Sequence, residues 1–269
     1  MRSDCIGFVG AGQMARALAR GMVRAGQVAA AIVAHDPARE AAQQFVEEIP
    51  GALMVGTNRE VLEKSRMIIL AVKPQSLAEV AVELAEVPKS DKLMVSILAG
   101  VRLSSLCRQL SSPRVVRVMP NTPSLVGCGA AAFALGPGAT REDSDQVSRL
   151  LGSVGMAFEV EERLLDAVTG LSGSGPAYVY AIIEALSDGG VRVGLPRKIA
   201  TALAAQTVLG AAQMVLSAAE HPAVLRERVT SPGGTTIAGL QLLERRGLRS
   251  ALIDAVEAAT RRSEELGQA

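Results

Sequence analysis

The feature that most constrains this chain is a glycine-rich run that comes directly after its first apolar stretch. Gly10, Gly12 and Ala15 form a G-x-G-x-x-A pattern between a β-rich run, Cys5–Gly10, and a segment with helical spacing. In that context the first glycine permits a tight turn, the second lets the backbone approach a pyrophosphate, and the alanine lets helix and strand pack closely. A glycine-rich turn without a ligand is the alternative, but the context favours a dinucleotide site.

Beyond this unit the chain alternates between β-rich runs and helical spacing up to about residue 160. The further β-rich runs are Ala31–His35, Met67–Val72, Leu93–Leu98 and Val115–Met119. From about residue 161 the strands stop, and Leu164–Leu266 has the spacing of helices interrupted by Gly and Pro. The sequence therefore predicts an α/β protein in which an N-terminal Rossmann domain with a doubly wound parallel sheet, residues 1–161, precedes an all-α domain, residues 162–269.

Composition excludes several classes of partner. The 28 basic residues nearly balance the 27 acidic ones, aromatic residues make up only 2% of the chain, and Trp is absent. A nucleic-acid binder would need a basic surface or stacking side chains, so we expect neither nucleic acid nor a membrane surface as partner. A core of small side chains is often completed against a second copy of the chain, so we expect a homo-oligomer.

The cysteines indicate a reducing compartment. Cys5, Cys107 and Cys128 are odd in number and widely spaced, without a CxxC or His-linked pattern, so we expect no metal site and no disulfide framework. We also expect no uninterrupted apolar stretch of membrane-spanning length and no signal peptide. These expectations together favour the cytoplasm.

The helix predicted after the glycine run carries Arg16, Arg20 and Arg24 on one face. Their four-residue spacing places them on a single stripe, whereas the apolar residues occupy another. We interpret the arginine stripe as a solvated face.

An acidic residue, Asp36, follows the second predicted strand about twenty positions after the glycine run. A carboxylate there can accept the hydroxyls of the adenosine ribose, which favours NADH. Asp36 and Pro37 equally suit the N-cap and first position of a helix over Ala38–Glu48. His35 and Arg39 flank the same place and can instead meet the 2′-phosphate of NADPH. The residues alone leave these interpretations open.

Ala71, Val72, Lys73 and Pro74 come at the end of another predicted strand. The carboxyl ends of parallel strands face the cofactor crevice in open α/β sheets, so Lys73 can approach a phosphate or a ribose there. A solvated loop lysine is the alternative, and the same alternative applies to Asn58.

Two glycine-rich runs interrupt the helical half, Thr169–Pro176 and Thr230–Thr236, each followed at once by an apolar helix. Backbone N–H groups at such a helix start can converge on a carboxylate, and Ser or Thr hydroxyls can donate to a second polar atom. Close packing between helices is the alternative for each run. The second run, with its consecutive Gly and Thr pairs, favours function.

Five motifs together resemble, in order and at similar intervals, those of the pyrroline-5-carboxylate reductases. They are Val9–Met14, Ala71–Pro74, Met119–Pro123, Leu171–Pro176 and Ser231–Ile237. The resemblance spans nearly the whole chain. It implies transfer of a hydride from NADPH, with NADH possible, to the C=N carbon of 1-pyrroline-5-carboxylate, giving L-proline in the last step of proline biosynthesis.

The resemblance also implies roles for individual residues. Thr236 would be the catalytic residue that hydrogen-bonds the ring nitrogen, and the substrate would be held by Ser231, Gly234, Thr235 and Thr236. The cofactor would contact Val9, Gly10, Ala11, Gly12, Gln13, Met14, Asp36, Asn58, Ala71, Val72, Lys73, Pro74, Ala99 and Asn121. Asn121 would lie beside the nicotinamide, although a plain turn residue before Thr122 and Pro123 is the alternative.

Some positions depart from the family pattern. Arg228 stands where an Asn contacts the cofactor, and a substrate-side Glu matches Ala219 or, with a shift of one residue, Glu220. Asp36 replaces a small polar residue that often accompanies use of NADPH, so the departure favours a relaxed or NADH-leaning preference.

The family further implies a homodimer formed through the helical half and commonly assembled into larger rings. The Gly-Gly-Thr-Thr run of one chain would then lie near the cofactor of the other. Leu248, Leu252, Ile253 and Val256 on the last predicted helix independently require a partner surface, which can be intramolecular.

Two other functions are possible for this architecture. A β-hydroxyacid dehydrogenase needs a Lys in the first long helix to handle the alcohol proton, and Ala177–Ile182 offers none. A non-catalytic dinucleotide sensor would not need a substrate loop such as Ser231–Thr236. Both are therefore less favoured than the reductase.

Overall fold

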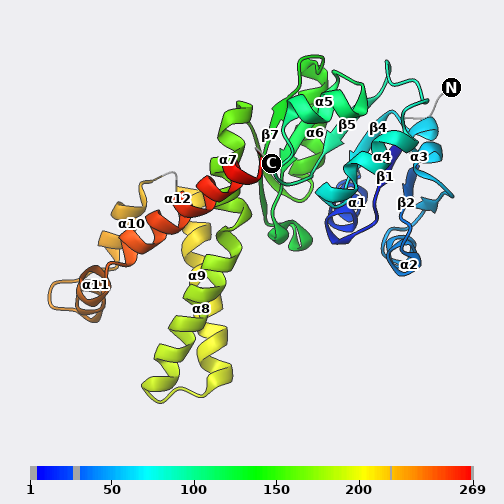
Figure 1. Ribbon diagram of the computed structural model, residues 1–269. Coiled ribbons are helices and arrows are strands. Elements are labelled where there is room, and N and C mark those ends of the chain that lie inside the picture. The colour runs from blue at the N-terminus through cyan, green and yellow to red at the C-terminus, as the bar shows by residue number, and fades with distance from the viewer. Residues whose placement is uncertain (1–4, 27–30, 219, 268–269) are drawn as a thin grey trace. The chain divides into compact units, whose positions relative to one another are not determined.

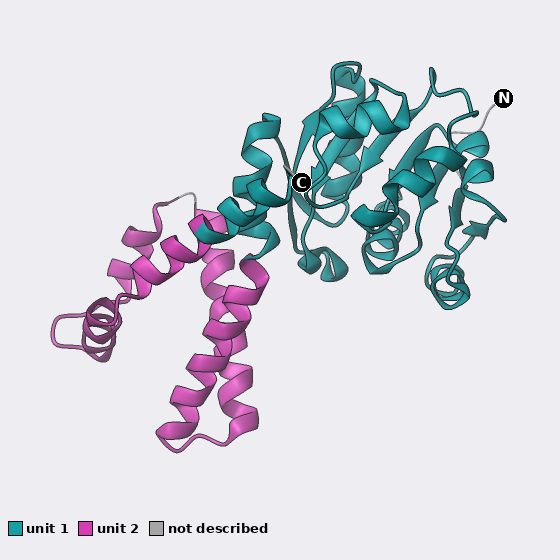
Figure 2. Ribbon diagram, viewed as in Figure 1, with its two compact units in different colours: residues 1–174, 258–269 teal, residues 175–257 magenta. Residues whose placement is uncertain are grey.

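The computed structural model describes residues 5–26, 31–218 and 220–267. The chain forms two compact units, coloured separately in Figure 2. The first comprises residues 1–174 and 258–269, and the second comprises residues 175–257. The first unit thus continues past residue 161, where we predicted the Rossmann domain to end, and it also includes the end of the last helix.

The first unit is built on one eight-stranded sheet in the order β3-β2-β1-β4-β5-β6-β7-β8. Its strands are β1 (Ile6–Val9), β2 (Ile32–His35), β3 (Leu53–Met54), β4 (Met67–Leu70), β5 (Leu93–Ser96), β6 (Val115–Met119), β7 (Gly129–Leu135) and β8 (Gly155–Glu159). Strands β1 to β6 are parallel, which confirms the doubly wound sheet. Strands β7 and β8 run in the opposite direction and were not predicted from the sequence.

Helices pack against this sheet (Figure 1). They are α1 (Gln13–Arg24), α2 (Arg39–Glu48), α3 (Asn58–Lys64), α4 (Leu77–Glu83), α5 (Leu103–Leu110), α6 (Arg141–Gly152) and α7 (Leu165–Val168), with short turns η1 (Pro74–Ser76), η2 (Thr122–Val126), η3 (Glu162–Leu164) and a π-helix, η4 (Thr169–Gly173). Successive strand residues enter different cores: Phe8 belongs to one hydrophobic cluster and Val9 to the other. Because both faces are buried, these strands are apolar throughout rather than alternating.

A buried carboxylate fixes the start of α6. Asp143 is fully buried, accepts two hydrogen bonds from the Arg114 guanidinium at 2.9 and 2.7 Å, and forms a capping box with Thr140. Burial by itself would raise the pKa of Asp143, but the hydrogen bonds from Arg114 and Thr140 hold that pKa below its ordinary value. The sheet and α6 are therefore joined by a charged group that needs its partner.

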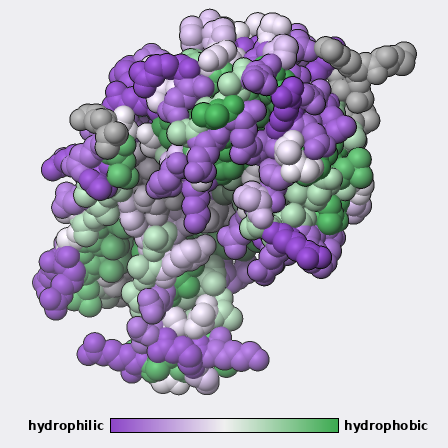
Figure 3. All heavy atoms as spheres, turned by 45° about the vertical axis from the view of Figure 1, so that its right-hand side comes forward, coloured by the Kyte–Doolittle hydropathy of each residue, from purple (hydrophilic) through white to green (hydrophobic). Residues whose placement is uncertain are grey.

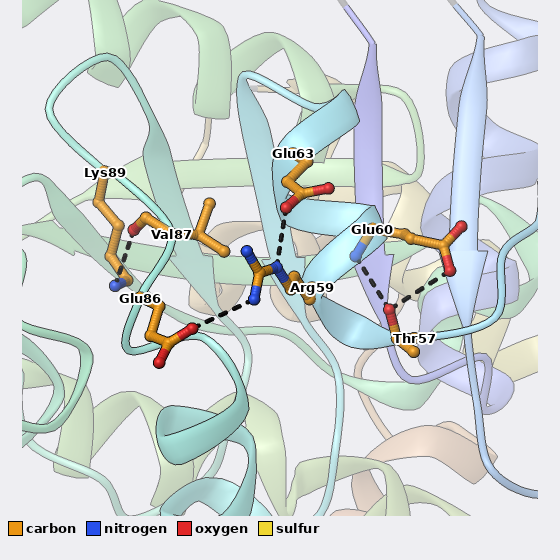
Figure 4. Close-up of polar contacts among 7 residues, drawn as sticks. All are labelled: Thr57, Arg59, Glu60, Glu63, Glu86, Val87 and Lys89. Atoms are coloured by element: carbon orange, nitrogen blue, oxygen red, sulfur yellow. Dashed lines mark hydrogen bonds and ion pairs between the residues drawn. The ribbon is translucent and has the colours of Figure 1, made fainter.

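Polar contacts also connect α3 with the segment after α4 (Figure 4). The Thr57 hydroxyl caps α3 by accepting the Glu60 N–H at 3.2 Å. Arg59 donates to Glu63 at 2.9 Å and to Glu86 at 3.2 Å. These side chains are exposed and screened by solvent, so each ion pair contributes little to stability. Their consequence is local: they hold the beginning of α3, where Asn58 lies.

The regular elements of the second unit, over its described residues 175–218 and 220–257, are all helices. They are α8 (Gly175–Arg192), α9 (Arg197–Ala218), α10 (Pro222–Arg228), α11 (Thr235–Arg245) and the first part of α12 (Leu248–Leu266). Helices α8 and α9 pack closely at Gly190, where an added Cβ atom would lie only 3.0 Å from the Ala200 Cβ atom. The hydroxyls of Ser187 and Thr201 meet at 2.7 Å in the same contact. The prediction that strands end before the helical half is confirmed.

Helix α9 exposes much of its apolar surface. Leu203, Leu209 and Leu216 are each more than half exposed, at 54%, 56% and 63%. Over its most apolar stretch α9 has a mean hydropathy of 1.6 with only 11% of the residues buried, so by length and composition it could cross a membrane. Our expectation that no stretch reaches that length is therefore wrong. Hydrophobic residues also reach the surface on the face drawn in Figure 3.

Candidate active site

The residues predicted to hold a dinucleotide gather after the carboxyl ends of the six parallel strands. The strands β1 to β6 are followed, in chain order, by Gly10, Asp36, Asn58, Ala71–Pro74, Ala99 and Asn121. The strand order reverses between β1 and β4, which is the switch point at which ligands bind in open α/β sheets. The topology therefore brings these predicted residues to one edge of the sheet.

The turn after β1 requires glycine at its first position. Gly10 has φ +96°, and a Cβ atom there would lie 2.7 Å from the carbonyl oxygen of Ala71. The Gly10 N–H donates to the His35 carbonyl at 2.8 Å, and the Ala71 N–H donates to the Val9 carbonyl at 2.8 Å. The turn is thus held between the ends of β2 and β4, and the prediction of a tight turn at Gly10 is confirmed.

The first turn of α1 is arranged to receive an anion. Gly12 is the N-cap residue, no side chain caps the helix there, and a Cβ atom built on Gly12 would meet nothing within 4 Å. The N-terminal N–H groups of a helix and its positive dipole end bind phosphates. Val9 and Ala11 are fully buried, so they can contribute only backbone groups, whereas Gln13 is exposed. This cradle fits a pyrophosphate.

Arg16 supports the same turn, which the sequence analysis missed. Its guanidinium donates to the Ala11 carbonyl at 3.3 Å and pairs with Glu48 at 3.2 Å, and its side chain is only 13% exposed. Arg20 pairs with Glu48 as well. Our interpretation of the arginine stripe as a solvated face is therefore wrong for these two residues. The signal was the position of Arg16 in the first turn after the glycine run, where the backbone carbonyl of the turn lies within reach.

Asp36 links the end of β2 to the glycine turn. Its carboxylate accepts the Ala11 N–H and the Ala38 N–H, each at 2.8 Å. The N-cap residue of α2 is Ala38, so the expected positions of Asp36 as N-cap and Pro37 as first helical residue are wrong by two residues. The carboxylate nevertheless supports the start of α2 through Ala38. His35 lies half-buried with Nδ1 3.1 Å from the Val55 carbonyl, as a strand-end residue would.

Asn58 and Lys73 have different surroundings. Asn58 is buried, and its amide nitrogen donates to the Glu83 carboxylate at 2.7 Å, so that group already has a partner in α4. Lys73, Pro74 and Ala99 are exposed at the ends of β4 and β5. Cofactor contacts by all four stay predictions.

Asn121 uses its side chain to join two backbone segments. Its amide nitrogen donates to the Ser172 carbonyl at 3.0 Å, and its amide oxygen accepts the Ala130 N–H at 2.9 Å. Ser172 belongs to the π-helix η4, and π-helical turns are frequent at functional sites. A Cβ atom at Gly173 would lie 2.5 Å from the Met119 methyl group, so this glycine lets the Met119 side chain pack closely against the run. The first glycine-rich run therefore packs against the end of β6.

The second glycine-rich run forms the start of α11. Gly233 has φ +67°, which favours glycine, and a Cβ atom at Gly234 would require the Ser231 hydroxyl to move. Gly234 is the N-cap residue without a capping side chain, and Thr235 and Thr236 are the first two helical residues. Thr235 is exposed and Thr236 is half-buried. These residues present backbone N–H groups and a hydroxyl together, as predicted for a carboxylate-bearing ligand.

Two of the positions that depart from the family pattern, Arg228 and Glu220, lie together. The guanidinium of Arg228 contacts both carboxylate oxygens of Glu220, at 2.8 and 2.7 Å. Arg228 and Glu220 are therefore ion-pair partners. The Glu220 carboxylate, which was a candidate for contacting the substrate, is already paired with Arg228. Ala219 lies outside the described residues.

The cysteines and other metal-ligating residues form no cluster in the part of the chain that the structure describes. Cys5, Cys107 and Cys128 are free. Burial raises the pKa of the Cys5 and Cys107 thiols, which keeps them protonated and unreactive at neutral pH.

Two family models match this chain. The model described as "Pyrroline-5-carboxylate reductase dimerisation" matches residues 162–266. The model described as "NADP oxidoreductase coenzyme F420-dependent" matches residues 5–100. A pyrroline-5-carboxylate reductase of Pisum sativum is 46% identical over 267 residues, which is 98% of this chain and 96% of that protein.

Solved structures agree with the sequence matches. A pyrroline-5-carboxylate reductase from Coxiella burnetii superposes with a TM-score of 0.92 at 33% identity, covering 99% of both chains. A pyrroline carboxylate reductase from Plasmodium falciparum with NADP bound superposes with a TM-score of 0.83 at 32% identity, again covering 99% of both.

Proposed function

This chain belongs to the pyrroline-5-carboxylate reductase family, and on that premise we propose that it reduces 1-pyrroline-5-carboxylate to L-proline, the last step of proline biosynthesis. The observation that carries the proposal is 46% identity to a reductase of that name over 98% of the chain. The family resemblance noted from five motifs is thereby confirmed. The oxidoreductase class follows from the same relatives.

NADP(H) is the cofactor that the relatives support, through the NADP oxidoreductase match and the NADP-bound structure from Plasmodium falciparum. NADH is compatible with the same cradle. The open N-terminus of α1 and the Gly10 turn fit the pyrophosphate that both dinucleotides share. When bound, the dinucleotide supplies the hydride. The protein would hold the pyrophosphate at the start of α1, and the residues at the strand ends would orient the adenosine and nicotinamide parts of the dinucleotide.

Substrate binding is assigned to the start of α11. Backbone groups around Gly234 and Thr235 would bind the substrate carboxylate through N–H groups other than that of Gly234, since they lie at an uncapped helix N-terminus. Ser231 forms the turn that presents them, because its carbonyl accepts the Gly234 N–H at 3.1 Å. The Thr236 hydroxyl would hydrogen-bond the ring nitrogen. A cyclic imine is protonated near neutral pH far more easily than a ketone, so positioning can supply most of the rate without a strong acid.

A homodimer formed through residues 162–266 completes the proposal. The match to a dimerisation model supports oligomerisation, and the exposed apolar side chains of α9 supply the surface that a partner chain would cover. We further propose that dimers assemble into a larger oligomer. A second chain on α9 also accounts for its high hydropathy without a membrane.

The proposed compartment is the cytoplasm. Its support is the three free cysteines, since a reducing compartment preserves thiols that would otherwise be oxidised.

The role of Thr236 is tested by comparing two threonines. Thr236→Ala should lower kcat for 1-pyrroline-5-carboxylate about 10²-fold, a typical cost of removing one positioned hydrogen bond at a reacting centre. Thr236→Ser, which keeps the hydroxyl, should recover most of the loss. Thr230→Ala is the matched control, because the Thr230 hydroxyl donates to the Arg226 carbonyl at 2.7 Å. Unchanged kcat in Thr236→Ala would contradict the role.

A further inference from the structure

The carboxylate of Asp36 lies beside the turn that fits a pyrophosphate. One of its oxygens accepts the Ala11 N–H at 2.8 Å, inside the glycine run itself. The adenosine ribose is joined directly to the pyrophosphate in both NADH and NADPH. A dinucleotide held at this turn therefore carries its adenosine ribose to the end of β2, where Asp36 is found.

The backbone donor at the start of α2 is already engaged by this carboxylate. The second oxygen of Asp36 accepts the N–H of Ala38, the N-cap residue of α2, at 2.8 Å. A 2′-phosphate at the end of β2 would need donors of this kind, and would bring negative charge against the carboxylate that holds them. Like charges at hydrogen-bond separation repel strongly in a partly buried site.

The same carboxylate has capacity left for a neutral ribose. A carboxylate offers about four acceptor positions, and two are used by the Ala11 and Ala38 N–H groups. The 2′- and 3′-hydroxyls of NADH can donate to the rest. Asp36 is half-buried, so hydrogen bonds to it are screened less than they would be on an open surface.

The structure records no contact between the Asp36 carboxylate and either neighbouring basic residue, so neither one neutralises its negative charge directly. His35 is directed to Val55, with Nδ1 3.1 Å from that carbonyl. Arg39 is exposed in the first turn of α2. A cation on a flexible, solvated side chain gains little from a phosphate that must also approach a fixed carboxylate.

We propose that Asp36 determines the cofactor ratio of this enzyme in favour of NADH, because its carboxylate occupies the place of the 2′-phosphate and accepts the ribose hydroxyls instead. The inference rests on the proposed reductase function for its physiological meaning, while both cofactors continue to support turnover. The inference itself concerns binding only: the end of β2 should prefer a ribose with a free 2′-hydroxyl to one with a 2′-phosphate.

The test measures binding of two nicotinamide-free probes, ADP-ribose and 2′-phospho-ADP-ribose, by titration calorimetry on the full-length protein. ADP-ribose should bind at least about tenfold more tightly, as expected for a hydrogen bond to a charged group. Asp36→Ser should shift the affinity ratio about tenfold to a hundredfold toward the phosphorylated probe. Asp36→Asn, which keeps the shape of the side chain but removes its charge, should shift the ratio in the same direction.

Glu40→Gln is the matched control, because it removes one exposed negative charge from the first turn of α2 and keeps the Asp36 carboxylate, so it should leave the ratio unchanged. Equal or tighter binding of 2′-phospho-ADP-ribose by the wild-type protein would overturn the inference, as would an unchanged ratio in both Asp36 variants or failure of ADP-ribose to bind. A correct probe preference without reduction of 1-pyrroline-5-carboxylate would instead refute the proposed function and leave the inference standing.

Discussion

The two compact units differ in how they bury apolar surface. In the first unit large side chains are fully buried, as with Phe8 and Phe45, whose rings pack 5.5 Å apart. In the second, the buried residues among those described are small: Ser187, Ala200 and Ala204. The first unit therefore has a core of its own, and the second needs a further surface to cover its leucines. The unit expected to bind the cofactor therefore has its own core, whereas the unit expected to bind the substrate leaves apolar surface uncovered.

The largest effect is expected at α9, whose exposed leucines distinguish the second unit from the first. Replacing Leu209 and Leu216 together by Glu should raise the dimer dissociation constant by at least about 10³-fold, because burying an unpaired charge is costly. Gln213→Glu adds a charge to the same helix at an exposed polar position and should change it little. Sedimentation velocity across protein concentrations measures the assembly. A double variant that assembles like the wild type would show that α9 is not the covered surface.

Core truncation sharpens the same contrast. Phe45→Ala in α2 should lower the free energy of unfolding by about 3–5 kcal/mol, because it opens a cavity in a fully buried cluster. Val46→Ala, at a 36% exposed neighbour, should cost about 1 kcal/mol or less. Leu203→Ala, measured in the monomeric double variant, should cost similarly little because its side chain is 54% exposed. Urea denaturation gives all three values, and a large cost for Leu203→Ala would mean that the second unit has a core of its own.

The buried pair of the first unit should give it an acid-sensitive stability. Asp143→Asn should cost about 3 kcal/mol at pH 7, since it leaves the Arg114 guanidinium without its anion. The pKa of Asp143 is lower in the folded state than its ordinary value of 3.8, so its contribution is fully present above that value and is lost as the pH falls below it.

The difference in unfolding free energy between wild type and Asp143→Asn should therefore shrink as the pH falls below about 3.8. Asp145→Asn, at a half-exposed partner of Arg141, provides the control and should change stability by less than about 1 kcal/mol. Denaturation curves at pH 7 and pH 3 make the comparison. A difference that grows on acidification would contradict the assigned direction.

A smaller effect is expected where the first glycine-rich run meets β6. Asn121→Ala should lower the stability of the first unit by about 2 kcal/mol, because it leaves the Ala130 N–H and the Ser172 carbonyl without their partner. Hydrogen exchange at the Ala130 amide should accelerate in the variant. Unchanged exchange together with weaker dinucleotide binding would instead assign Asn121 to the cofactor alone.

The same contrast explains what the sequence could predict. Strands such as Met67–Leu70 are short, β-rich and buried on both faces, so local composition was sufficient to find them. Strand β7, with the sequence GAAAFAL, is rich in alanine, which has a weak preference for strands, and only its neighbours in the sheet make it one. Arg16 was misjudged for a related reason, because its partner Glu48 lies on another helix.

The candidate site likewise has features that could be predicted from the local sequence and features that could not. The turn at Gly10 could be predicted because its positive φ is a local need for glycine, whereas its close approach to Ala71 after β4 is a long-range contact that the structure adds. The role proposed for Thr236 could come only from resemblance, because an uncapped helix start with a hydroxyl does not by itself identify the ligand that binds there. Helix α9 shows the limit of composition, since its hydropathy alone does not say what covers it.

The most direct test of hydride transfer to a cyclic imine uses reduced dinucleotide carrying deuterium at the transferred C4 position of the nicotinamide. Wild-type protein incubated with 1-pyrroline-5-carboxylate and either labelled NADPH or labelled NADH should yield L-proline with a single deuterium on the ring carbon next to nitrogen, the former C=N carbon. Mass spectrometry and NMR of the product locate the label. Unlabelled proline, or oxidised dinucleotide formed without proline, would contradict the reductase assignment.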